Sequence, residues 1–78
     1  MKKKIKLIWQ FSGTNAIKIA DHHLVHLNEY ILQHDIDVID KGTELINEFS
    51  SVSFIIIDND LVEKLRVVLK PHKGLIVE

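Results

Sequence analysis

The most constraining feature of the sequence is the run at residues 52–57, which reads Val-Ser-Phe-Ile-Ile-Ile. Successive side chains of a β-strand point to opposite faces of the sheet. Because four consecutive residues from Phe54 to Ile57 are all apolar, both faces of such a strand must be buried. The run therefore predicts a central strand, and the rest of the chain has to supply its neighbours and its covering layers.

The N-terminal half of the chain predicts a strand followed by a long helix. Residues 4–11 alternate between apolar and polar side chains, which indicates a strand. Residues 15–33 have the helical period, and His23 lies at the border of the apolar arc, where a packed and hydrogen-bonded histidine is expected. Ser12, Thr14 or Asn15 is expected to cap this helix. The arc consists of Ala16, Ala20, Leu24, Leu27 and Ile31.

The C-terminal half predicts two more strands and a second helix around the central run. Residues 37–46 fit either a strand or a helix, and a strand is favoured because a short turn at 47–50 leads directly into the central run. Asp58, Asn59 or Asp60 is expected to cap the second helix, which Pro71 ends. Residues 75–77 predict a short last strand. The apolar stripe of the second helix consists of Leu61, Val62, Leu65, Val68 and Leu69.

This β-α-β-β-α-β order resembles the ferredoxin-like superfold. The resemblance implies an α+β sandwich, with a four-stranded antiparallel sheet that carries two helices on one face. The chain shares no signature motif with the metal chaperones, RNA-recognition motifs or acylphosphatases of that shape; where the chaperones have a CxxC, it has Gln-Phe-Ser-Gly at 10–13. The opposite sheet face would be apolar and uncovered. We therefore expect a homodimer that packs through this open face.

Length and composition limit the functions that the chain can have. Its 78 residues form a single domain, 1–78, and the absence of cysteine excludes thiol catalysis and cysteine-ligated metals and fits a cytoplasmic location. A formal charge of -1 argues against nucleic-acid binding. The basic run of Lys2, Lys3, Lys4 and Lys6 precedes a strand pattern, so it is not a signal peptide. No apolar run is long enough for a membrane span, and no cofactor motif is present.

One candidate metal site lies on the polar side of the first helix. His22 and His26 are one turn apart, and Glu29 follows three residues after His26. Two imidazoles at this spacing can bind Zn²⁺, Ni²⁺ or Cu²⁺, and Glu29 would supply a third ligand. The alternative interpretation is an exposed polar helix face without a metal.

A candidate anion site follows from the predicted topology. The loop after the first strand contains Ser12, Thr14 and Asn15, and the loop after the second helix contains His72 and Lys73. Both loops would lie at one end of the sandwich, where hydroxyls, cations and free helix N–H groups bind a phosphate or carboxylate. The alternative interpretation is an ordinary strand-to-helix turn.

Two classes of function remain open at the level of the sequence. One is a small homodimeric module that binds a small anionic ligand or another protein. The other is a small enzyme that uses His72, His23 or His26 as a general base at a dimer seam, or a protein whose histidines bind a metal. A module that binds is favoured, because 78 residues leave little room for a catalytic cleft.

Overall fold

The strands and helices follow one another in the predicted order in the computed structural model, which describes residues 3–77. Of the two alternatives for residues 37–46, the strand is the one found. Lys2 of the basic run lies outside the described residues. The elements are β1 (Lys4–Ser12), α1 (Ala16–Gln33), β2 (Asp40–Asn47), β3 (Ser50–Asp58), a 3₁₀ turn (Asn59–Leu61), α2 (Val62–Leu69) and β4 (Lys73–Val77).

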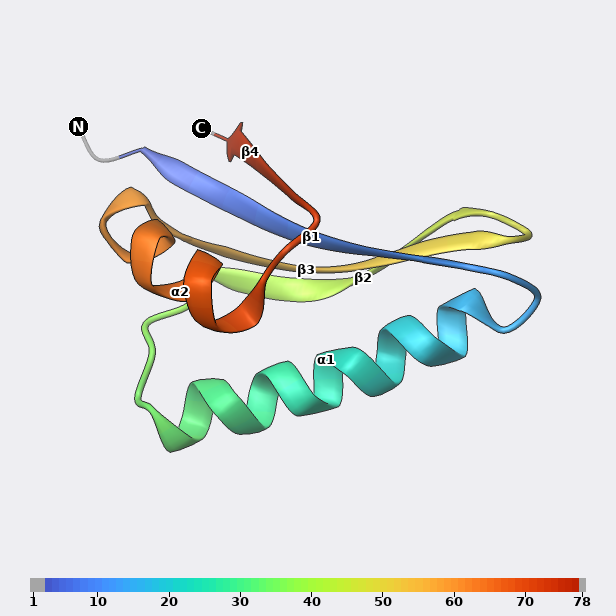
Figure 1. Cartoon of the computed structure of the whole chain (residues 1–78), viewed down its shortest axis with the longest axis horizontal. Coiled ribbons are helices and arrows are strands. Elements are labelled where there is room, and N and C mark those ends of the chain that lie inside the picture. The colour runs from blue at the N-terminus through green and yellow to red at the C-terminus, as the bar shows by residue number, and fades with distance from the viewer. Residues whose placement is uncertain (1–2, 78) are drawn as a thin grey trace.

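The four strands form one antiparallel sheet in the order β2-β3-β1-β4 (Figure 1). β1 and β3 are the central strands, and they pair along their full lengths from Lys4 opposite Asp58 to Ser12 opposite Ser50. β4 pairs only with the first part of β1, where Lys73 lies opposite Ile8. The predicted central strand is therefore confirmed, and β1 extends four residues past the start of β4.

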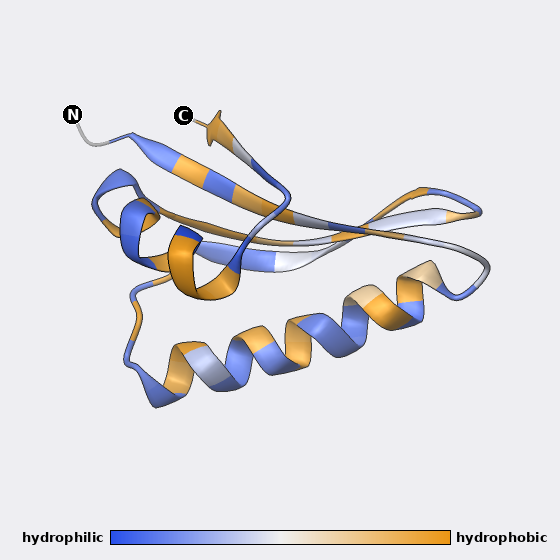
Figure 2. Cartoon of the chain, in the orientation of Figure 1, coloured by the Kyte–Doolittle hydropathy of each residue, from blue (hydrophilic) through white to orange (hydrophobic). Residues whose placement is uncertain are grey.

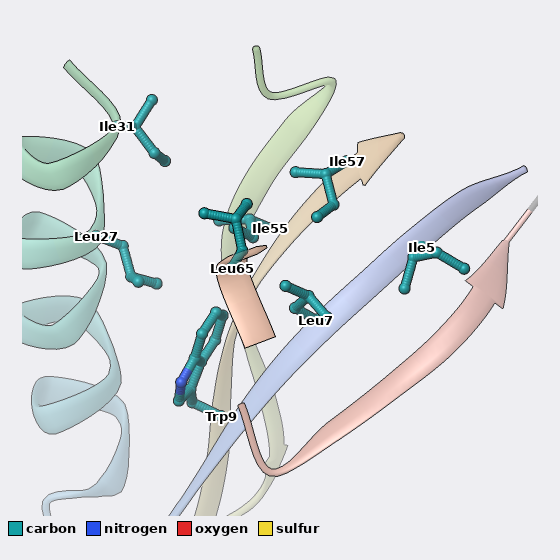
Figure 3. Close-up of a cluster of buried hydrophobic side chains, with 8 residues drawn as sticks. All are labelled: Ile5, Leu7, Trp9, Leu27, Ile31, Ile55, Ile57 and Leu65. Carbon is teal, nitrogen blue, oxygen red and sulfur yellow. The ribbon is translucent and has the colours of Figure 1, made fainter. Parts of the chain in front are cut away.

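One hydrophobic core joins both helices to the same side of the sheet (Figure 3). The odd-numbered side chains of β1 and β3 point toward this core, and Figure 2 shows the alternation of hydrophilic and hydrophobic residues in the first part of β1. The arc predicted for α1 is confirmed, because all its members are buried or partly buried. The buried residues of the core are Ile5, Leu7, Trp9, Leu27, Ile31, Ile55, Ile57 and Leu65.

The side chains that pack between α1 and β3 become larger along the helix. At the helix N-terminus the buried side chains are small: Ala16 and Ala20 on the helix, Ser51 and Ser53 on the strand. Further along, Leu27 and Ile31 pack in the core with the isoleucines of β3. Small side chains let backbones approach closely, so the first turns of α1 lie nearer to the sheet than the last turns do.

The cap position predicted for α1 is confirmed, but the predicted capping hydrogen bond is not found. Asn15 occupies the N-cap position of α1, but its side chain makes no capping hydrogen bond, because its φ of -107° and ψ of 21° lie outside the extended region that capping residues adopt. The N-cap of α2 is Leu61, after a 3₁₀ turn that the sequence pattern does not reveal.

Val68 of the stripe predicted for the second helix is half exposed, because it lies at the edge of the arc away from the core.

Within residues 3–77, neither helix combines the length and the apolar character needed to cross a bilayer.

Candidate functional site

The structure separates the residues of the predicted anion site into two groups. Ser12, Thr14 and Asn15 are exposed at the far end of β1. His72 and Lys73 lie beside the middle of β1, because β4 begins opposite Ile8. Four residues of strand span roughly 13 Å, so the two groups do not share one pocket. The sequence pattern places both loops at one end of the sandwich, but it does not reveal how far β4 extends along β1.

His72 lies immediately before the first residue of β4 and continues its hydrogen bonding to β1. Its backbone N–H donates to the Ile8 carbonyl at 2.9 Å, and its ring Nδ1 accepts a hydrogen bond from the Gln10 backbone N–H at 2.8 Å. An imidazole nitrogen that accepts a hydrogen bond carries no proton of its own. The proton of the His72 ring is therefore on Nε2. The Phe11 ring lies 6.4 Å away, edge to face. The His72 side chain thus accepts the hydrogen bond of the Gln10 backbone N–H, which lies past the part of β1 that pairs with β4.

His23 is the packed border histidine that the sequence predicts. Its Nδ1 lies 2.7 Å from the Ser53 hydroxyl, and its ring lies against Trp9 and Phe11 at centroid distances of 5.2 and 5.3 Å. Burial, and then the nearby imidazoles of His26 and His72, lower the pKa of His23 below its ordinary value. The serine-histidine contact resembles a catalytic pair, but Ser53 is 0% exposed and has no access to a substrate. The contact therefore holds α1 against β3.

The predicted metal-ligating residues lie together on the exposed side of α1, but they do not converge. Nε2 of His22 and Nε2 of His26 are 3.0 Å apart, while Glu29 approaches the opposite nitrogen of His26, Nδ1, at 3.8 Å. A metal held by the two Nε2 atoms would therefore be out of reach of this Glu29 conformer. Among residues 3–77 no group of three or more metal-ligating side chains comes together.

The face of the sheet opposite the helices carries an apolar stripe with one member from each strand. Ile8 of β1 and Val52 of β3 form its centre; Leu75 of β4 and Ile46 of β2 form its ends. Leu75 is 50% exposed and Ile46 is 55% exposed, while the two central residues are covered by their neighbours. A shallow hollow of about 360 Å³ lies over the stripe. We call this side of the sheet the open face.

Phe54 of the open face is covered within the chain. The Lys6 ammonium lies 4.3 Å from the centre of its ring and forms an ion pair with Glu44 at 2.7 Å. The ring itself extends across Gly42, where a Cβ atom would come within 3.2 Å of it. Gly42 therefore makes room for the ring, and the exposed apolar surface of this face is concentrated in the stripe.

The charges of the open face are divided between its two halves. Alternation along each strand and the strand register place Lys4, Lys6 and Lys73 on β1 and β4, and they place Asp40, Glu44 and Asp58 on β2 and β3. One half is therefore basic and the other acidic, with the apolar stripe crossing both.

Comparisons with protein-family models, with curated proteins and with solved structures find no match to this chain. Function is therefore argued from the geometry alone.

Proposed function

We propose that this chain is a small cytoplasmic interaction module that pairs with a second copy of itself through the open face, and that its architecture is a ferredoxin-like βαββαβ sandwich. The strand order β2-β3-β1-β4, with every neighbouring pair antiparallel, supports this architecture. So does the single core that contains residues of both helices.

The observation that carries the proposal is the apolar stripe across an uncovered sheet. Both helices pack on the other side, so the half-exposed Leu75 and Ile46 have no covering layer within residues 3–77. Large apolar side chains that lie half exposed on a sheet face without a covering layer indicate a site of interaction. A sheet packed against another sheet buries such a surface without unpaired backbone groups.

The division of charge favours a second copy as the occupant. A two-fold axis parallel to the strands and between two facing sheets places β1 and β4 of one copy over β3 and β2 of the other. Lys73 of each copy then faces the partner's acidic half, which contains Asp40 and Glu44. The surface is thus complementary to itself in charge, and the apolar stripes meet in the middle.

The size of the face predicts a weak dimer. Four strands at about 4.8 Å spacing and about eight residues long present roughly 500 Å² on each copy, or about 1,000 Å² in total. This area is near the lower limit for a specific interface. We therefore expect a homodimer that dissociates in the micromolar range.

Sedimentation equilibrium over the micromolar range tests the proposal. The wild type should fit a monomer-dimer equilibrium, and Leu75→Glu should remain a monomer because it places a charge on the stripe. Leu32→Glu is the matched control, since Leu32 is an exposed leucine of α1 on the other side of the molecule. A wild type that is a monomer throughout, or a control that dissociates as readily as Leu75→Glu, would contradict the proposal.

A further inference from the structure

A second hollow lies on the helix side of β4, between α2 and the first part of β1, and of the two loops predicted as a site only the loop after α2 contributes to it. Its volume is about 380 Å³, which is within the range of small-molecule pockets. Its apolar lining consists of Ile5, Leu7, Val62 and Pro71. In Figure 1 the chain passes from α2 directly into β4 at this place. We call this hollow the β4 groove.

Gly74 keeps the β4 groove open. A Cβ atom at this position would lie 3.6 Å from Leu7 and 3.8 Å from Ile5, both of which line the groove. These are ordinary contact distances, and the backbone of Gly74 does not have a positive φ, so a larger residue would fit there. Glycine weakens a strand, and within strands it marks places where another molecule approaches closely. Here its missing side chain leaves free space beside Leu7 and Ile5, which are themselves buried.

The ionisable side chains that line the β4 groove are basic. They belong to Arg66 and His72, since the side chain of Lys73 lies on the open face, and the described lining includes no acid. Arg66 has one acidic neighbour, Glu63, at 3.6 Å. Both side chains of this pair are more than 60% exposed, so the pair contributes little and leaves the guanidinium free to bind an anion.

His72 adds a neutral donor to the same groove. Its Nδ1 is occupied by the Gln10 N–H, so Nε2–H is the ring's remaining polar group. The hydrogen bond to Gln10 also fixes the ring beside β1, which lowers the entropy cost of using it for recognition.

We propose that the β4 groove binds a small organic carboxylate with an apolar body. The carboxylate accepts hydrogen bonds from the Arg66 guanidinium and from His72 Nε2–H, and the body lies beside Gly74 against the partly exposed Val62 and Pro71. A guanidinium matches a carboxylate with two parallel hydrogen bonds, which explains the preference for this headgroup. The apolar lining distinguishes such a ligand from a free inorganic anion.

Titration with octanoate, followed by amide chemical shifts in NMR, tests this proposal. Octanoate should shift the resonances of residues 72–74, and 1-octanol, which has the same chain without the charge, should bind at least about tenfold more weakly. Arg66→Gln should weaken the binding of octanoate by at least about tenfold and leave the binding of 1-octanol unchanged. Lys64→Gln, at an exposed cation on the same helix, is the matched control and should change neither.

Gly74→Val tests the shape of the groove independently of its charge. The added side chain should fill the space over Leu7 and weaken octanoate and octanol alike, and valine suits a strand. The β4 groove and the open face lie on opposite sides of β4, so monomeric Leu75→Glu should still bind octanoate. Equal affinity of wild type and Arg66→Gln for octanoate, or displacement of octanoate by an equal concentration of inorganic phosphate, would overturn the proposal.

Discussion

The side chain of His23 links α1 to β3 and makes stability depend on pH. Its pKa is lowered mainly by burial, so the folded state binds a proton less readily than the unfolded state does. The contribution of His23 to the free energy of unfolding is therefore complete above its ordinary pKa of about 6.5 and is lost as the pH falls through the lower pKa of the folded state.

His23→Gln should remove this part of the pH dependence. Urea unfolding of wild type and variant at a series of pH values gives the difference between their free energies of unfolding, and wild type should lose stability relative to the variant below about pH 6.5. His22→Gln, on the exposed side of the same helix, should keep the wild-type slope. An unchanged slope in His23→Gln would show that another group is responsible.

Among the secondary-structure elements, α2 depends most on a single contact. It has eight residues, of which only Leu65 is fully buried, and its last turn is held by a hydrogen bond from Trp9 Nε1 to the Leu69 carbonyl at 2.9 Å. A helix this short does not form alone in water. The indole of β1 therefore ties the last turn of α2 to the sheet, while the left-handed Lys70 and Pro71 end the helix.

Trp9→Phe should loosen α2 more than the rest of the molecule. The loss of one hydrogen bond and some core volume should lower the free energy of unfolding by about 1–2 kcal/mol. In native-state hydrogen exchange, the amides of α2 should lose more protection than those of α1. Equal loss in both helices would mean that Trp9 acts only through the shared core.

The features that could be predicted from the sequence are those that follow from local periodicity. The run at 52–57 predicts a central strand because both its faces are apolar, and the spacing from Ala16 to Ile31 identifies the buried side of α1. The capping hydrogen bonds could not be predicted from residue type, because Asn15 and Asp58 occupy N-cap positions without making them, Asp58 even with extended backbone angles.

The candidate sites could be predicted only in part, because they depend on long-range pairing. The sequence identifies His72 and Lys73 as candidates, but the register of β4 on β1 separates them from Ser12, and His72 lines the same hollow as Arg66. Gly74 is the one local signal of the β4 groove, since a glycine inside a short strand at which no turn is needed indicates a close approach. The Ser53 partner of His23 has no such signal.

For the whole molecule, the two proposed surfaces are independent. The open face carries the divided charges and the apolar stripe, and the β4 groove lies on the helix side of the same edge strand. A dimer that pairs through the open face therefore leaves the groove accessible to a small ligand.

Mixing two charge-reversed variants tests the central claim of self-pairing most directly. Lys73→Glu places an acid opposite the acidic half at both contacts of its homodimer, and Asp40→Lys places a cation opposite Lys73 at both contacts, so each variant alone should be a monomer in sedimentation equilibrium. In the mixed pair both contacts become attractive again, and an equimolar mixture should restore the dimer. A mixture that stays monomeric at concentrations where wild type is a dimer, or variants that each dimerise as wild type does, would contradict the proposed pairing.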